Sequence, residues 1–84
     1  MPQHQNIEYK SAWNDDYLKW VCGFANADGG LIFIGKDDHG KTLGINNYKK
    51  LMEDIPNKIR NSMGIMVEVN LHEESEKYFI EMAV

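Results

Sequence analysis

Four consecutive apolar residues, Leu31-Ile32-Phe33-Ile34, constrain the fold of this chain more than any other feature. Glycines flank the run on both sides, with Gly29-Gly30 before it and Gly35 after it. A strand that is apolar at every position is typical of one that other elements cover on both faces. We therefore expect this run to be a buried strand, and the rest of the chain must supply what covers it.

An amphipathic helix is predicted directly before this strand. Ser11 or Asn14 can cap its start, and Asp15 and Asp16 fall in its first turn, where the helix dipole favours acidic residues. The glycines at 29–30 can supply the left-handed residue that closes the helix. Its apolar stripe comprises Trp13, Tyr17, Leu18, Trp20, Val21, Cys22, Phe24 and Ala25. Because Cys22 belongs to this stripe, we expect a buried, unreactive thiol.

The remaining patterns predict a second helix and four further strands. Asn46-Asn47 can cap the second helix, which continues to Met63 with its apolar residues on one face. Pro56 should kink or split this helix, because proline cannot donate to the helical ladder. Alternation of apolar and polar residues indicates the strands. They are expected at 6–10, 41–45, 65–71 and 78–84.

These elements predict an α/β (α+β) fold with the order β-α-β-β-α-β-β. Hairpins make the sheet mixed and partly antiparallel, and two helices accompany it. A chain of 84 residues has the length of one domain. Because the last predicted strand runs into the C-terminal residue, we expect residues 1–84 to be a single domain that begins a longer protein.

Residues 35–42 match the spacing G-x-x-x-x-G-K-[ST] of a phosphate-binding loop. That loop requires a helix immediately after its last residue, so that the helix amides face the phosphates. Thr42 is instead followed by a β-branched residue and a glycine at 43–46, and Asp37 and Asp38 would repel a triphosphate. A tight hairpin turn is therefore the preferred interpretation, and ATP binding is the weaker alternative.

Composition restricts the classes of protein that need considering. A single cysteine excludes an internal disulfide framework, and no apolar run approaches the roughly 18 residues of a membrane span. The first five residues lack the regions of a signal peptide, so a cytoplasmic location is expected. His4, His39, His72 and Cys22 do not have the spacing of a zinc site, so we assign no metal and expect no cofactor.

The net charge of −4 argues against a protein that coats DNA by general attraction, but the charge is uneven. Residues 1–40 carry three lysines against six acidic residues, and residues 61–84 carry one lysine against five. Only the segment 41–60 is basic, with five cations against Glu53 and Asp54. This segment is either a solvated helix face or a patch for an anionic partner.

Several separated strings resemble one known family, the Schlafen-type Alba-like domain. That family's pattern combines glutamate-x-lysine, A-f-a-N-x-G-G followed by a strand, i-G-x-d-d-x-G, and a short x-x-G. The matching strings are Ile7-Glu8-Tyr9-Lys10, the segment 23–35, Asp37-Asp38-His39-Gly40 and Gly44-Ile45. The resemblance extends from residue 3 to about residue 80.

The resemblance implies a mixed α/β domain found at the N-terminus of transcriptional-regulator-like and helicase-like proteins, with DNA binding as its role. In the animal Schlafens, related domains belong to an RNA-cleaving core with clustered carboxylates. Glu8 matches one of these carboxylates and Asp37 or Asp38 another, but Gln3 stands where the family has its first glutamate. The positions that match the family pattern as structural residues are Glu8, Asn26, Gly29, Gly30, Gly35 and Gly40.

The main hypothesis is a nucleic-acid-binding module, with DNA as the expected ligand. One alternative is a metal-dependent nuclease that uses Glu8 and Asp37 or Asp38. Another is a structural module that forms a homodimer through a free sheet edge. Under the main hypothesis the phosphate-contacting residues are Lys10, Lys36, Lys41, Lys49, Lys50, Lys58 and Arg60.

Overall fold

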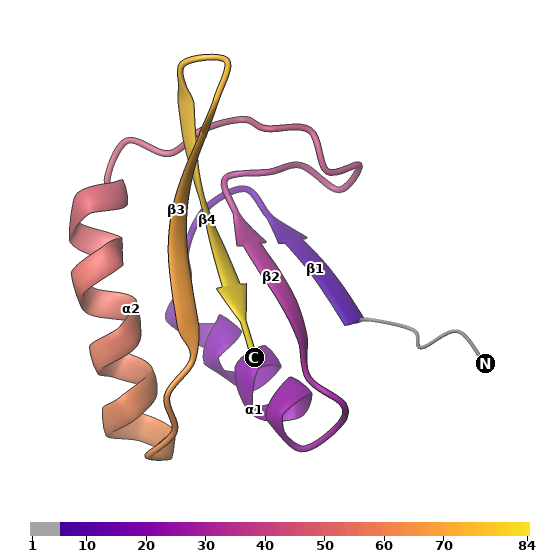
Figure 1. Ribbon diagram of the computed structural model, residues 1–84, viewed down its shortest axis with the longest axis vertical. Coiled ribbons are helices and arrows are strands. Elements are labelled where there is room, and N and C mark those ends of the chain that lie inside the picture. Colours follow the sequence, from indigo (N-terminus) through magenta and orange to yellow (C-terminus); the bar gives the residue numbers. More distant parts are fainter. Residues whose placement is uncertain (1–5) are drawn as a thin grey trace.

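A four-stranded sheet carries both helices on one of its faces (Figure 1). The computed structural model of the chain describes residues 6–84. Across the sheet the strands lie in the order β1-β2-β4-β3, with β1 parallel to β2 and the other neighbours antiparallel. The elements are β1 (Asn6–Lys10), a 3-10 turn (Asp15–Tyr17), α1 (Leu18–Ala25), β2 (Gly30–Ile34), α2 (Tyr48–Met63), β3 (Glu68–Glu74) and β4 (Lys77–Ala83). The predicted mixed sheet with two helices is confirmed.

The predicted strand at 41–45 is reduced to a single antiparallel bridge between Thr42 and Lys36. It cannot continue because the backbone N–H groups of Leu43 and Gly44 both turn to the carbonyl oxygen of Gly35, at 2.7 and 3.0 Å. Residues 35–42 therefore form the tight turn that was preferred to a phosphate-binding loop. The segment 43–47 separates this turn from α2, so no helix follows Thr42 directly.

Alternate residues of β2 and β4 form the floor of the core. Ile32, Ile34, Ile80 and Met82 are fully buried on the side of the sheet that faces the helices. The helices cover this floor and complete the core with Val21 and Phe24 of α1 and with Leu51, Ile55 and Ile59 of α2. The apolar spacing of both helices in the sequence is thus accounted for by packing onto one sheet face.

The predicted burial of Cys22 is wrong, because its side of α1 faces away from the core and its side chain is exposed. The α-helix begins only at Leu18, after the 3-10 turn, and of its residues Val21 and Phe24 are the buried ones. Cys22 follows Val21 by about 100° around the helix. Its sulfur accepts a hydrogen bond from the Asn26 side chain at 3.6 Å.

α2 is one continuous helix, so Pro56 does not split it. Leu51 and Ile55 before the proline and Ile59 after it are buried on the same face. Packing on both sides of Pro56 therefore holds the two halves together despite the missing N–H donor. The helix ends at Gly64, which has the left-handed conformation (φ 68°).

The corner between α1 and β2 depends on two glycines. Gly29 has φ 86°, and a Cβ there would lie 2.5 Å from the Val84 carbonyl oxygen. A Cβ on the buried Gly30 would lie 2.6 Å from the Phe24 ring and 2.7 Å from the Asn6 carbonyl oxygen. Strand β1 and the chain end at Val84 therefore approach this corner more closely than any side chain would permit.

The sheet face opposite the helices carries a row of rings. Tyr9 stacks on Phe33 at a centroid distance of 5.4 Å, Phe33 lies 6.2 Å from Phe79, and Phe79 stacks on His72 at 5.1 Å. The turn at 35–42 folds onto part of this row, since Gly40 lies against the Tyr9 ring. This face is therefore partly covered by the chain's own loop.

Candidate nucleic-acid interface

The structure divides the predicted cations into two groups and does not bring them into one cluster. Lys10 ends β1, and Lys36 and Lys41 lie in the turn that follows β2. The other four lie on α2, which packs against β3 and β4. β1 lies at one edge of the sheet and α2 packs against β3 and β4 toward the other, so the two groups come from different parts of the fold. The second group comprises Lys49, Lys50, Lys58 and Arg60.

In the first group, Lys10 is held by its own domain. Its Nζ lies 3.6 Å from Glu8 Oε2, because residues two apart on a strand point to the same face. The ammonium also lies 5.1 Å from the centroid of the Tyr17 ring and 5.3 Å from that of Trp20, within the range of cation–π attraction. The glutamate-x-lysine pair therefore ties β1 to the start of α1.

Lys36 is likewise engaged within the domain. Its Nζ donates to the Gly40 carbonyl oxygen at 3.1 Å and to Thr42 Oγ1 at 3.0 Å, and it lies 4.1 Å from the centroid of the Phe79 ring. The Thr42 hydroxyl in turn donates to Glu74 Oε1 at 2.8 Å. These contacts hold the 35–42 turn on the sheet, so the charge of Lys36 has a structural use.

Asp37 shapes the same turn. Its Oδ1 accepts the backbone N–H groups of Lys41 and His39, both at 2.9 Å. The Lys41 hydrogen bond is the main reason that the pKa of the Asp37 carboxyl lies below its usual value, because the bond favours the ionised form. Lys41 itself has an exposed side chain with no ion-pair partner among residues 6–84.

A cavity of about 260 Å³ lies where β1 and β2 end. The carboxyl ends of neighbouring parallel strands are a common place for ligands in α/β folds. Lys10 and Lys36 meet there with Asp37 and Asp38, the two candidates for the second carboxylate of the nuclease alternative. The lining residues are Tyr9, Lys10, Ser11, Tyr17, Lys36, Asp37, Asp38 and Leu43.

Glu8 does not line this cavity, and within residues 6–84 no three His, Cys, Asp or Glu side chains are grouped to hold a metal ion. Gln3, the position of the family's first glutamate, lies outside the described residues. The nuclease alternative stays a prediction that rests on the resemblance. The homodimer stays a prediction that rests on a free sheet edge.

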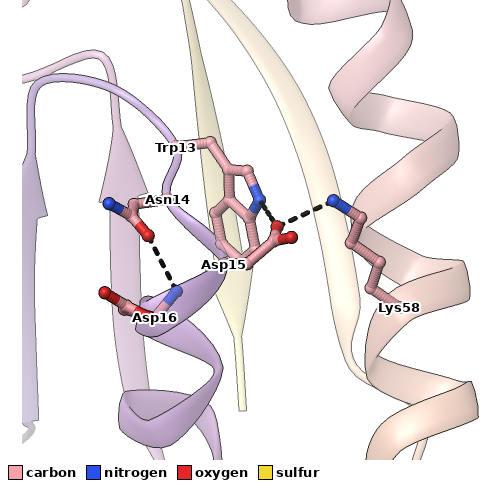
Figure 2. A network of polar contacts seen from close by, with 5 residues as sticks. All are labelled: Trp13, Asn14, Asp15, Asp16 and Lys58. Atoms are coloured by element: carbon pink, nitrogen blue, oxygen red, sulfur yellow. Dashed lines mark hydrogen bonds and ion pairs between the residues drawn. The ribbon is translucent and has the colours of Figure 1, made fainter.

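Lys58 of the second group is paired with a carboxylate (Figure 2). Its Nζ lies 2.7 Å from Asp15 Oδ1, which also accepts the Trp13 indole N–H at 2.8 Å. The Lys58 contact, followed by that of Trp13, keeps the pKa of Asp15 below its usual value. Asn14 caps the same turn by accepting the backbone N–H of Asp16 at 2.9 Å, as predicted. Lys58 thus connects α2 to the start of α1.

The other three cations of α2 are exposed and have no ion-pair partner in the described part of the chain. Lys49 and Lys50 lie in the first turn of α2 and Arg60 in its last turn. Lys49 and Arg60 are three helical turns apart, so they project from the same side at a separation of ~16 Å along the axis. We call Lys49, Lys50 and Arg60 the α2 cations.

One larger groove was not predicted from the sequence. It has a volume of about 420 Å³ and lies between the loop before α2 and the turn of the β3–β4 hairpin. Tyr48, which the sequence places at the helix start, lines it together with Tyr78. In the sequence, Tyr78 stands out only as one of the alternating apolar residues at 78–84. That alternation predicts a buried side chain and does not indicate a groove.

Comparisons with known proteins agree on one family. The model of the family Schlafen, AlbA_2 matches residues 3–84. The solution structure of the N-terminal domain of a RecG-related protein from Nitrosomonas europaea, assigned as an ATP-dependent DNA helicase, has a TM-score of 0.77 and 25% identity. It covers 93% of this chain, which spans only 61% of that domain. No curated protein matches the sequence.

A crystal structure of a protein from Corynebacterium diphtheriae also matches, with a TM-score of 0.69 and 15% identity. The match covers 95% of this chain and 18% of that protein, and at this identity it shows the fold alone. Within residues 6–84, neither helix has the length and apolar character needed to cross a membrane.

Proposed function

The chain belongs to the Schlafen AlbA_2 family, and from this premise we propose that it is a nucleic-acid-binding module of a larger protein, with DNA as its ligand. The RecG-related neighbour supports a role in DNA transactions, either in a helicase-like protein or in a transcriptional regulator. One observation carries the proposal: the α2 cations are exposed and lack carboxylate partners among residues 6–84.

The α2 cations contact backbone phosphates in this proposal, with Lys41 as a further contact from the turn after β2. The ~16 Å between Lys49 and Arg60 corresponds to about five base-pair rises of 3.4 Å, so one helix face can follow a strand. Phosphate contacts of this kind position a protein on nucleic acid and carry no sequence preference. Attraction must be local, because the chain as a whole carries a net charge of −4.

Lys10, Lys36 and Lys58 contribute less in this proposal than the sequence suggests. Each already has partners inside the domain, namely Glu8, Thr42 and Asp15 respectively. A phosphate would have to replace those contacts, so the gain from binding is partly offset by what is lost.

Charge reversal tests the proposal. We expect Lys49→Glu/Lys50→Glu/Arg60→Glu to weaken binding to duplex DNA, single-stranded DNA and structured RNA alike, as measured by fluorescence anisotropy at two salt concentrations. With four phosphate contacts, the logarithm of the wild-type affinity for duplex should fall with the logarithm of salt concentration at a slope of about −3.6. Lys58 is left unchanged, since its substitution would also break the contact with Asp15.

Lys19→Glu is the matched control for a single reversal such as Lys50→Glu, because Lys19 is an exposed lysine on α1 outside the proposed surface. We expect Lys50→Glu to reduce affinity more than Lys19→Glu does. Equal effects would mean that only net charge matters. Unchanged binding in the triple variant would exclude this surface.

A further inference from the structure

The groove beside the hairpin turn combines aromatic and polar groups. Its walls come from the loop before α2, from the first residue of α2 and from the start of β4. Its volume of about 420 Å³ falls within the range of small-molecule sites. The lining residues are Leu43, Gly44, Ile45, Asn46, Tyr48, Glu76, Lys77 and Tyr78.

Two tyrosines give this groove its character. The rings of Tyr48 and Tyr78 are stacked, with centroids 4.2 Å apart and planes inclined by 23°. Both side chains are half-buried, so part of each ring remains accessible. The backbone N–H of Ile45 donates to the Tyr78 carbonyl oxygen at 3.0 Å, which fixes the loop against the hairpin. The pair is therefore a rigid aromatic surface at the edge of a cavity.

We propose that this groove binds an unpaired base of a single-stranded nucleic acid, stacked on the Tyr48–Tyr78 pair. The proposal rests on the nucleic-acid binding proposed above and adds the class of ligand. Bases of every kind stack on aromatic side chains, and such stacking is a main source of single-strand affinity. Lys77 lines the groove and the exposed Lys49 follows Tyr48 on α2, so cations are available for the flanking phosphates. The Asn46 amide offers a donor and an acceptor for the edge of the base.

Geometry favours a single strand over a duplex at this position. In a duplex the base faces are covered by their neighbours, and only a strand with free bases can place one in a groove. Acidic side chains at the hairpin oppose a dense phosphate backbone there. Glu76 lines the groove, and the negative charge of Glu73 raises the pKa of Tyr78. A single base with two flanking phosphates brings less negative charge to this place than a duplex would.

Substitutions at Tyr48 test whether a base of the bound strand stacks on the Tyr48 ring. The 84-residue chain is titrated by fluorescence anisotropy with an oligodeoxythymidine of ~12 nucleotides, which lies within the site sizes of single-strand binding folds, and with a duplex of equal length. We expect Tyr48→Leu to weaken binding of the single strand by about 5- to 150-fold, the range for loss of one base–aromatic stack. Tyr48→Phe keeps the ring and should bind as the wild type does. Duplex affinity should be unchanged in both variants.

Ring resonances provide a second measurement if Tyr48→Leu is poorly folded. In the wild-type chain, the oligodeoxythymidine should shift the NMR signals of the Tyr48 and Tyr78 rings, and the duplex should not. Single-strand binding that survives Tyr48→Leu, or equal loss of both ligands, would overturn the inference. If the wild type binds duplex through the α2 cations but not the single strand, only this inference fails. If it binds neither ligand at low salt, the proposed function fails as well.

Discussion

A methyl group added at Gly30 should destabilise the domain, whereas one added at Gly23 should stabilise it. A Cβ at position 30 would lie 2.6 Å from Cδ2 of Phe24, 2.7 Å from the Asn6 carbonyl oxygen and 2.9 Å from the Asn6 Cβ. Two of these atoms belong to β1, which pairs with β2 through Gly30 itself. The backbone of Gly30 is not left-handed, so the conflict is one of contact and not of conformation.

The magnitude follows from these contacts. Overpacking a well-packed site costs about 1–3 kcal/mol, and here a strand or the Phe24 ring must move to make room. For a domain of this size, 1 kcal/mol changes Tm by about 4–8 °C, so Gly30→Ala should lower Tm by about 4–24 °C. At Gly23, in the middle of α1, a Cβ would meet nothing within 4 Å. Gly23→Ala should therefore gain about 0.5–1 kcal/mol from helix propensity, or about 2–8 °C.

Thermal unfolding followed by circular dichroism at 222 nm measures both variants under the same conditions. The two substitutions make the same chemical change, so they differ only in their surroundings. A Gly30→Ala variant as stable as the wild type would refute the close approach of β1, α1 and β2 at this corner. A reversed order of the two variants would refute the assignment of Gly23 to an open helix surface.

Three further outcomes are expected. Ser75 and Glu76 both have positive φ in the β3–β4 turn, so Glu76→Gly should raise stability by up to about 1 kcal/mol in a denaturant titration; a loss would mean that Glu76 makes a contact that outweighs its strain. The pKa of Asp37 is lowered in the folded chain, so the ionised carboxylate stabilises the fold. This contribution is complete at pH values above the unfolded pKa of 3.8 and is lost as the pH falls through the lower folded pKa. An NMR titration of Asp37 with a midpoint at or above pH 3.8 would contradict this. Cys22 is exposed, so iodoacetamide should alkylate it without denaturant; protection in the native chain would contradict its placement.

Periodicity alone was sufficient to predict most of the fold. Three patterns each indicate an apolar face that must be buried: the run at 31–34, the helical stripe around Val21 and the alternation at 78–84. Residues from all three pack in the same core. Local chemistry also predicted the tight turn at 35–42, because Asp37 and the glycines leave few other conformations.

The failed predictions for the two helices have a common physical origin, since both depend on contacts distant in sequence. The register of α1 that exposes Cys22 is set by what Phe24 meets in the sheet, and α2 survives Pro56 because the sheet packs against both of its halves. The same is true of the candidate interface. No pattern could show that Asp15 neutralises Lys58, or that Tyr78 comes to lie on Tyr48.

The pairing of β2 with β4 has a consequence for how the molecule assembles. β1, α1 and β2 form one contiguous half of the chain, and α2, β3 and β4 form the other. The two halves share backbone hydrogen bonds where β2 meets β4, from Leu31–Ala83 to Ile34–Ile80, and between Gly30 and Val84 just beyond that range. Because this seam joins the two halves within one sheet, it couples them into one cooperative unit. Amides in the seam are accordingly expected to exchange with deuterium only on global unfolding, while the outer edge of β1 exchanges through local fraying.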